Sequence, residues 1–423
     1  MKISLVSLPA YPVVDPTASG VFGGTETRAV TLARSCARNP QYEIHFFARH
    51  PALTTSREID QVHWHSWPDP QMDRRARIAA AFLSRRTFPF IHFSKLTPQL
   101  LLDIPLVFIQ QLWTRLMGQS KVEPALNSVE TDLFAAFGVH SVSHRVMRTA
   151  HALGKPFVLL PGSDADLDPA ILESRPFRTR YGERSEICAQ VIQQADLIFV
   201  QNEYQQTILS TKFSRDSSLL LNPIDLKAWD LQASHCLAMP LPDEPFVLWM
   251  GRAERFHKRA DLALEIALQT PDIPYLFVIN PADDELLREL QRKRPANVQF
   301  VSRIPFAEVS ALMSRARLLL NTSSKVYEGF PNVLLQASAS SLPILSLEVD
   351  PGYLTAANAG IVISQQSRSA ADVLQELFHD PQQLESMGRA GREYVHQQHQ
   401  DQLVADQFLK RVAELTRKLS GKS

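Results

Sequence analysis

Short apolar runs that alternate with helical stretches are the feature that most constrains the fold of this chain. Runs such as Phe246–Met250 and Leu318–Asn321 are almost continuously apolar, which is typical of strands buried on both faces of a parallel sheet. The alternation predicts an α/β fold built on doubly wound sheets. The predicted strands are Ile3–Ser7, Ile44–Ala48, Val62–His65, Leu106–Ile109, Leu133–Phe137, Phe157–Leu160, Leu197–Gln201, Ser218–Leu221, Phe246–Met250, Tyr275–Ile279, Val298–Val301, Leu318–Asn321, Ile344–Leu347 and Gly360–Ile363.

The two sets of predicted strands are separated by a segment with a different composition. Asp225–Glu244 contains no strand pattern and ends among Pro240, Pro242 and Pro245, so it is interpreted as a linker. A length of 423 residues fits two or three domains. From Gln397 to Leu419, apolar residues recur at helical spacing, which predicts a long amphipathic helix. The expected units are an N-terminal domain (1–225), the linker (226–243), a C-terminal domain (244–395) and a C-terminal helix (396–423) that packs back on the N-terminal domain.

Composition excludes several classes of protein. Lys and Arg together number 44, as do Asp and Glu, so the chain lacks the basic excess of a nucleic-acid-binding protein. Three scattered cysteines give neither a disulfide framework nor a zinc site, and they fit a reducing, cytoplasmic compartment. The first residues run into Pro9 and Pro12 without a signal sequence, and no apolar stretch is long enough to span a membrane.

Residues 74–121 interleave basic and large apolar side chains, and two interpretations of them stay open. One is contact with an anionic membrane surface, with the protein peripheral on the inner face of the membrane. The other, which is the commoner arrangement, is a helix and strand pair that covers the sheet and has a solvated basic edge. The basic residues are Arg74, Arg75, Arg77, Arg85, Arg86, Lys95, Arg115 and Lys121.

Three loops between a strand and a helix carry candidate binding residues. Near the N-terminus, Gly20, Gly23 and Gly24 precede a helical run, where backbone N–H groups at the positive end of the helix can approach an anion. A strand–turn–helix that needs glycine only for its geometry is the alternative for this loop.

The second domain opens with a strand followed by two cations. Arg252 comes directly after Gly251, and Lys258 lies just before the helical run Ala260–Ala267. The planar fork of arginine and the point charge of lysine suit a diphosphate, whereas ordinary surface charge is the alternative.

The strongest motif is EGFPN, residues 328–332, in the loop after strand Leu318–Asn321. Proline is favoured at a first helical position, so a helix is expected to begin at Pro331. Its free N–H groups can then bind phosphate oxygens. Glu328 beside them can accept hydrogen bonds from sugar hydroxyls, and Gln336 lies about two turns along the same helix.

With these motifs in order along both halves, the chain resembles glycosyltransferase family 4, the retaining sugar-nucleotide transferases of the GT-B fold. The second half carries most of the resemblance, in VLWMGRAERFHKRADLALEIA, NVQFVSRIPFAEVSALMSRARLLLNTS and YEGFPNVLLQA. The first half adds GGTETRAVTLARS, GKPFVLLPGSDAD, ADLIFVQNEYQ and LLLNPID. The resemblance implies two Rossmann-like domains that face each other across a cleft.

The resemblance also implies roles for individual residues. Arg252 and Lys258 would bind the donor diphosphate and stabilise the leaving nucleotide, and Glu328 would contact the donor sugar; these three are the implied catalytic residues. Gln336 stands where the family has a second Glu that holds the ribose, and the Arg303–Ile304 backbone would contact the base. The implied donor-binding residues are Gly23, Gly24, Gly251, Arg303, Ile304, Gly329, Phe330, Pro331, Asn332, Val333 and Gln336.

The implied reaction moves a sugar from a nucleoside-diphosphate sugar to a carbohydrate, lipid-linked or small-molecule acceptor. It needs no metal and no cofactor other than the donor substrate, and no nucleic acid is a partner. The protein is expected to be cytoplasmic.

Three departures from the family pattern stand out. Gln336 replaces a Glu and carries no charge, although its amide can still hydrogen-bond hydroxyls. The spacing from Arg252 to Lys258 is one residue longer than the commonest form. Pro161 stands where many members have a histidine; His140 and His144 are candidates to replace it, although lone histidines are more often structural.

Alternatives remain for one motif and for the function. Asp164, Asp166 and Asp168 resemble a metal-binding Asp-x-Asp run, but a calcium loop would not have Pro169 and Arg175 at its sixth and twelfth positions, so a turn and cap is favoured. The alternative functions are a GT-B sugar-nucleotide epimerase and a non-catalytic, nucleotide-sugar-binding partner in a glycan-assembly complex.

Overall fold

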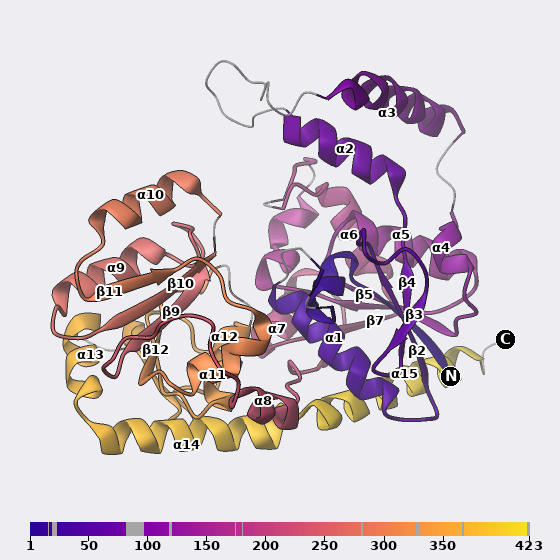
Figure 1. Ribbon diagram of the computed structural model, residues 1–423. Coiled ribbons are helices and arrows are strands. Elements are labelled where there is room, and N and C mark those ends of the chain that lie inside the picture. The colour runs from indigo at the N-terminus through magenta and orange to yellow at the C-terminus, as the bar shows by residue number, and fades with distance from the viewer. Residues whose placement is uncertain are drawn as a thin grey trace.

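The computed structural model consists of two α/β domains, each built on one sheet, with helices on both sides (Figure 1). The residues that it describes are 1–15, 17–18, 23–81, 97–117, 121–173, 175–179, 181–280, 282–326, 328, 330–365 and 368–420. The α/β prediction is confirmed.

The N-terminal domain holds an eight-stranded sheet with the order β3-β4-β2-β1-β5-β6-β7-β8. All neighbouring strands are parallel except β3, which runs antiparallel to β4 at the edge. Ile3 in the middle of the sheet lies opposite both Ile44 and Leu133. The strands are β1 (Lys2–Val6), β2 (Glu43–Ala48), β3 (Arg57–Ile59), β4 (Val62–Ser66), β5 (Leu133–Phe137), β6 (Phe157–Leu160), β7 (Leu197–Val200) and β8 (Ser218–Leu219).

The C-terminal domain holds a six-stranded sheet, parallel throughout, with the order β11-β10-β9-β12-β13-β14. Its middle strands, β9 and β12, are the ones that lead into the two cation- and glutamate-bearing loops. The strands are β9 (Val247–Arg252), β10 (Tyr275–Asn280), β11 (Val298–Val301), β12 (Leu318–Asn321), β13 (Ile344–Ser346) and β14 (Gly360–Val362).

Helices connect successive strands and cover both faces of each sheet. The α-helices are α1 (Gly24–Ala37), α2 (Pro70–Ala81), α3 (Pro98–Met117), α4 (Pro124–Asn127), α5 (Ser141–Ala152), α6 (Ser185–Gln194), α7 (Glu203–Lys212), α8 (Leu226–Gln232), α9 (Ala260–Gln269), α10 (Asp284–Lys293), α11 (Val309–Met313), α12 (Asn332–Ala339), α13 (Ala370–Phe378), α14 (Pro381–Gln398) and α15 (Asp401–Ser420). The 3-10 helices are η1 (Leu8–Val13), η3 (Asp164–Leu167), η4 (Pro169–Leu172), η5 (Phe306–Glu308) and η6 (Ile363–Gln365).

One sequence prediction of local structure is wrong. Leu106–Ile109 is not a strand but part of helix α3, because a short apolar run does not by itself distinguish a strand from a helix. The predicted linker 226–243 begins with helix α8, whose N-terminus is capped by the Asp225 carboxylate accepting from the Ala228 N–H at 3.0 Å.

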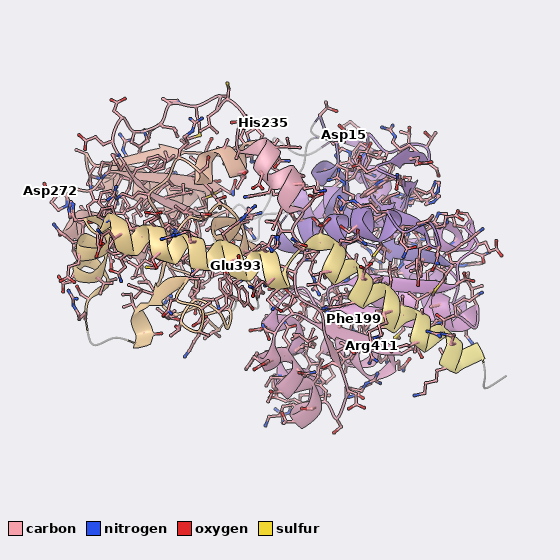
Figure 2. The ribbon with its side chains drawn as sticks, turned by 90° about the horizontal axis from the view of Figure 1, so that it is seen from below. Asp15, Phe199, His235, Asp272, Glu393 and Arg411 are labelled. Carbon is pink, nitrogen blue, oxygen red and sulfur yellow. The ribbon has the colours of Figure 1, made fainter. Side chains whose placement is uncertain are left out.

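The predicted C-terminal helix is divided in two. Helix α14 continues to Gln398, and α15 starts at Asp401 after a break at His399 and Gln400. Seen from below, α14 runs beneath the C-terminal domain and α15 runs beneath the N-terminal domain (Figure 2). The chain therefore returns to its first domain at the break.

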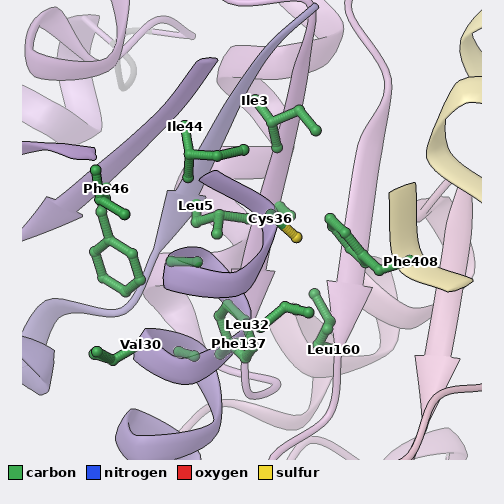
Figure 3. Packing of buried hydrophobic residues seen from close by; sticks show 14 of the residues in the cluster. Ile3, Leu5, Val30, Leu32, Cys36, Ile44, Phe46, Phe137, Leu160 and Phe408 are labelled. Carbon is green, nitrogen blue, oxygen red and sulfur yellow. The ribbon is translucent and has the colours of Figure 1, made fainter. Parts of the chain in front are cut away.

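Helix α15 completes the core of the N-terminal domain. Val404, Phe408 and Val412 are fully buried in the cluster that surrounds β1 and α1, and the Phe408 ring lies 5.3 Å from that of Phe199. Figure 3 shows Phe408 close to Leu160 and Cys36. Because burying such side chains is worth about 1.5–3 kcal/mol each, α15 is held firmly to this domain.

The break between α14 and α15 pairs with the first crossing between the domains. The Ile224 N–H donates to the His399 carbonyl at 2.8 Å, and the Asp401 N–H donates to the Ile224 carbonyl at 3.1 Å. The His399 ring is fully buried, and its Nδ1 lies 2.7 Å from the Asn222 carbonyl oxygen. A carbonyl acceptor requires that this nitrogen carry the proton.

We expect the buried His399 to make the protein less stable in mild acid. Burial lowers the pKa of His399 to about 4, against the partly opposing hydrogen bond to Asn222. In the unfolded chain the pKa of this histidine is about 6.5. Between pH 4 and pH 6.5 the unfolded state therefore binds more protons than the folded state. Stability is therefore complete above about pH 6.5 and is lost as the pH falls toward 4, by roughly 2–3 kcal/mol at pH 4.5.

The measurement is the free energy of urea unfolding from about pH 7 to about pH 4.5. The His399→Gln variant keeps an N–H donor but does not titrate, and its curve should be flatter than that of the wild type by this amount. The matched control is His235→Gln at an exposed position, which should follow the wild type. Parallel curves for wild type and His399→Gln would contradict the prediction.

Candidate functional site

The candidate site lies where loops at the carboxyl ends of the parallel strands of both domains meet. In the C-terminal domain, one loop joins β9 to α9 and another joins β12 to α12. In the N-terminal domain, the segment after β6 and the start of α1 lie on the opposite side. Crevices outside the carboxyl ends of strands are the usual binding places of open α/β sheets.

Glu328 is the centre of a buried charge cluster. Its side chain is 9% exposed, and its Oε1 contacts the Lys258 ammonium and lies 3.0 Å from Nε2 of His257. Burial by itself would raise the pKa of Glu328, but the charge of Lys258 and the contacts with His257 outweigh it and lower the pKa to about 2. Glu328 is therefore ionised at every pH at which the protein is expected to work.

The sequence predicted Lys258 and Glu328, and the structure brings them into direct contact. The Lys258 ammonium also reaches the Ser323 hydroxyl at 3.4 Å. His257, the third member of this cluster, was not singled out from the sequence. The signal for it was its position directly before Lys258 in a loop already assigned to a charged ligand.

The two loops of the C-terminal domain are fastened to each other by Trp249 and Thr322. The Trp249 indole N–H donates to the Thr322 hydroxyl at 2.9 Å, and that hydroxyl donates to the Lys258 carbonyl at 2.6 Å. Arg259 adds a hydrogen bond to the Ser323 carbonyl at 3.0 Å and a contact with Glu348. These contacts of Thr322 and Arg259 therefore fix the position of the backbone around Lys258.

Gly251 is a position at which a side chain does not fit. A Cβ there would lie 2.8 Å from the Trp249 ring and 3.2 Å from the Lys258 Cβ. Arg252, at the end of β9, is the most exposed of the three predicted catalytic residues, with 58% of its side chain accessible, and it pairs with Glu254 at 2.9 Å. Arg252 therefore lies at the rim of the site, whereas Lys258 and Glu328 lie deeper.

The EGFPN segment differs from the prediction in where its helix begins. Pro331 is the capping residue with an extended backbone, and α12 starts at Asn332 rather than at Pro331. Phe330 is buried, with its ring 5.1 Å from that of His399. Gly329 and the upstream Gly20 lie outside the described residues.

Asn332 connects the two domains directly. Its Nδ2 donates to the Gly24 carbonyl at 2.8 Å, and its Oδ1 accepts from Nδ2 of Asn222 at 2.8 Å. Gly24 leaves room for this contact, since a Cβ there would lie 3.0 Å from Nδ2 of Asn332. Two of the predicted donor-binding residues, Asn332 and Gly24, are therefore hydrogen-bonded to each other across the domain boundary.

The other N-terminal glycine already has a partner. The Gly23 N–H donates at 2.7 Å to the Glu26 carboxylate, which forms a capping box at the start of α1. The Gly23 N–H, which the sequence analysis assigned to a bound anion, is therefore already hydrogen-bonded to the Glu26 carboxylate.

The remaining predicted residues lie farther along the C-terminal domain. Gln336 lines a pocket between α1, α8 and α12, together with Asn332 and Phe306. Arg303 is exposed, whereas Ile304 and Val333 are partly buried against the domain core.

Asp164 is a candidate site residue that sequence reasoning assigned to a turn. It accepts from Gln205 at 2.9 Å and from Asn202 at 3.2 Å. Burial, together with the nearby charge of Glu328, raises the pKa of Asp164 to about 6. The Asp164 carboxyl group, which belongs to the N-terminal domain, is thus close enough to Glu328 of the C-terminal domain for the two charges to interact.

The neighbouring acidic residues have local structural roles. Asp166 accepts from the Gly162 N–H at 2.7 Å and the Val139 N–H at 3.2 Å, and Asp168 accepts from the Ala170 N–H at 2.9 Å. These contacts fit the favoured turn and cap. Within the described part of the chain, no group of three or more His, Cys, Asp or Glu side chains is arranged to hold a metal ion.

The two candidate histidines lie at the two ends of one turn of helix α5. His140 caps α5, because its Nδ1 accepts from the Ser143 N–H at 3.2 Å. His144 lies 3.0 Å from the Gln190 side chain on α6 and is part of the packing between these helices.

Comparison with known proteins gives a family match for the part of the chain that holds the cluster. Residues 240–394 match the family model described as glycosyl transferases group 1. This range holds both C-terminal loops and ends within α14. The comparison with curated proteins gave no match.

Solved structures match the chain over nearly its whole length. Sucrose-phosphate synthase from Thermosynechococcus elongatus has a TM-score of 0.66 and 17% identity, with 100% of both chains covered. HepE from Anabaena, in complex with UDP and glucose, has a TM-score of 0.61 and 13% identity over 98% of this chain and 100% of its own.

A third similar structure has a different activity in its name. The putative UDP-N-acetylglucosamine 2-epimerase from Listeria monocytogenes has a TM-score of 0.56 and 10% identity over 99% of this chain and 97% of its own. These likenesses confirm the predicted fold, two Rossmann-like domains in the GT-B arrangement. Assignment to family 4 stays a prediction.

We expect Gly251→Ala to destabilise the protein by about 1–3 kcal/mol, since the added methyl group would overlap the Trp249 ring. The measurement is a double-mutant cycle in urea unfolding. In the Trp249→Phe background, which removes the overlapping ring atoms, the same change should cost about 1 kcal/mol less. Equal costs in both backgrounds would mean that Trp249 is not what excludes a side chain at position 251.

Proposed function

We propose that this protein is a glycosyltransferase that moves a sugar from a nucleoside-diphosphate sugar to an acceptor. The observation that carries the proposal is the cluster of Glu328, Lys258 and His257 at the mouth of the C-terminal sheet, next to the N-terminus of α12. The match of residues 240–394 to the group 1 glycosyl transferases supports it.

In this proposal the C-terminal domain holds the donor. Arg252, Lys258 and the first N–H groups of α12 bind the diphosphate, and they offset the charge that grows on it as the sugar leaves. Such groups lower the barrier because they interact more strongly with the transition state than with the bound donor. Glu328, ionised and buried, accepts hydrogen bonds from the sugar hydroxyls and holds the Lys258 ammonium in place.

The proposed reaction retains the configuration of the sugar and needs neither a metal nor a cofactor. The acceptor oxygen attacks on the face from which the diphosphate departs, and the departing phosphate oxygen takes the acceptor proton. Arg252 and Lys258 supply the positive charge that a metal ion would otherwise supply. Closure of the two domains over the donor excludes water.

On the N-terminal side we assign the acceptor hydroxyl to Asp164. Its carboxylate lies near the Glu328 charge, and its pKa of about 6 leaves it mostly ionised at neutral pH. An ionised carboxylate accepts a hydrogen bond from the hydroxyl and orients it toward the sugar. The acceptor is a carbohydrate or a lipid-linked molecule, and we propose a cytoplasmic location.

The first donors to test are UDP-sugars, because HepE was crystallised with UDP and glucose. A thermal-shift screen with UDP-, GDP-, ADP- and CMP-sugars identifies the donor, since a ligand that binds only the folded protein raises Tm by mass action. A screen in which no nucleotide sugar raises Tm would contradict the proposal.

Two other functions have specific support. The fold is shared with a putative UDP-N-acetylglucosamine 2-epimerase, so incubation with the donor alone should be checked for an epimerised sugar. Gln336, in place of the family's second Glu, favours a protein that binds the nucleotide sugar without turning it over. Binding by calorimetry without transfer or hydrolysis would identify that case.

We expect Lys258→Ala to lower kcat by about 10²–10³-fold with the donor that the screen identifies, because one fixed donor to the leaving group is lost. The measurement is release of the nucleoside diphosphate. Lys293→Ala on α10 is the matched control, since this lysine pairs with Glu289 at an exposed position and should leave turnover unchanged.

Glu328→Ala separates binding from transfer. It should abolish sugar transfer while free nucleotide still binds, since Glu328 is assigned to the sugar rather than to the diphosphate. Turnover within about threefold of wild type in both variants would remove the cluster from the mechanism, because the loss of even one fixed donor costs far more.

We expect kcat/KM to fall below about pH 6, because a protonated Asp164 no longer accepts the hydrogen bond that orients the acceptor hydroxyl. Asp164→Asn should be less active at neutral pH and should lack this titration. Asp168→Asn, which changes the exposed neighbouring cap, should keep the wild-type profile. An unchanged profile in Asp164→Asn would assign the titration to another group.

A further inference from the structure

Helices α2 and α3 form a pair that stands away from the sheet of the N-terminal domain (Figure 1). The pair is joined by ion pairs between Arg77 of α2 and Asp103 of α3, at 2.7 and 3.0 Å. Arg74 lies 3.8 Å from the same carboxylate. Arg85, Arg86 and Lys95, which belong to the same basic segment, lie outside the described residues.

Helix α3 has its polar and apolar faces reversed. Asp103 is only 3% exposed and faces α2, whereas Leu101, Phe108 and Trp113 are 76%, 69% and 62% exposed. In a surface helix of a soluble domain the apolar face is turned toward the core. The exposed apolar face of α3 comprises Leu101, Leu102, Ile104, Leu106, Phe108, Ile109, Leu112 and Trp113.

These side chains cover a broad part of the helix surface. At about 100° per residue, Leu101, Phe108 and Leu112 share one line, and Ile109 and Trp113 extend the apolar surface around one side. Helices that dock into a protein groove usually present a narrower stripe, at positions i, i+3, i+4 and i+7. A broad, convex apolar face suits a fluid surface better than a groove.

The charge of the same segment is positive. Its described residues, 70–81, 97–117 and 121, contain five Arg and Lys residues and two Asp residues, a net charge of +3, within a chain whose total charge is zero. The remainder of the chain is therefore negative. Basic residues beside an exposed apolar helix face are the pattern that binds anionic lipids.

We propose that α3 lies flat on an anionic lipid bilayer, with its apolar face among the acyl chains and the neighbouring basic residues at the headgroups. No described helix is long and apolar enough to span a membrane. The interaction is thus peripheral. If the proposed transferase function holds, the acceptor is presented at the membrane surface; lipid binding itself does not depend on that function.

Trp113 provides a direct probe of this contact. All five tryptophans lie within the described residues, and Trp113 is exposed whereas Trp64, Trp67, Trp229 and Trp249 are buried. The full chain is mixed with vesicles of phosphatidylcholine alone, or of phosphatidylcholine with phosphatidylglycerol. We expect sedimentation with the anionic vesicles, a blue-shifted emission, and protection of Trp113 from an aqueous quencher.

Salt and substitution test the two parts of the interaction separately. Raising salt from about 50 to about 500 mM should weaken binding about tenfold or more. Leu101→Ser with Phe108→Ser should also weaken it about tenfold or more, because two large apolar side chains no longer enter the lipid. The matched control, Leu231→Ser with Leu268→Ser, changes leucines that are 74% and 51% exposed elsewhere and should bind as the wild type does.

Other results would overturn the proposal. Absence of sedimentation at low salt would exclude a lipid surface. Equal binding by the two double variants would exclude α3 as the contact. A concentration-dependent dimer in which Trp113 is protected without lipid would identify a second copy of the chain as the occupant of this face. None of these measurements requires a sugar donor, so their outcome is independent of the transferase assay.

Discussion

Two chain crossings, bonded to each other, determine how the two sheets face one another. The first crossing passes Asn222 and Ile224, and the second passes His399 and Asp401. A single crossing would leave the two domains free to rotate relative to each other. Two that exchange backbone hydrogen bonds define one hinge, and α15 anchors the far side of that hinge by burying Phe408 in the N-terminal core. The loops at the carboxyl ends of both sheets are consequently brought to the same cleft.

Much of the fold follows from local patterns in the sequence. Strands buried on both faces are apolar along their whole length, and β9 and β12 were therefore predicted correctly. The same criterion failed for Leu106–Ile109, because an apolar run that faces solvent on a helix has the same composition as a buried strand. Only three-dimensional placement shows that Asp103 faces inward and its leucine neighbours outward.

The candidate site could be predicted in part, and for a similar reason. Lys258 and Glu328 each lie in a recognisable loop after a strand, so their residue types could be read from the sequence. Their mutual contact could not, because it joins positions 70 residues apart. The contact nevertheless has a clear physical reason, since the buried charge of Glu328 would be costly if it were not paired. Asp164 and the bridge from Asn332 to Gly24 depend on the meeting of two domains, to which no local spacing corresponds.

The bridge made by Asn332 has a consequence for how the cleft exchanges its contents. This side chain begins α12 and at the same time holds the first turn of α1 and the Asn222 amide of the hinge region. An anion that settles at the start of α12 must share the space with it or displace it. Binding of an anion there would therefore be coupled to the angle between the domains, and a change that loosens the hinge would also change the affinity for that anion.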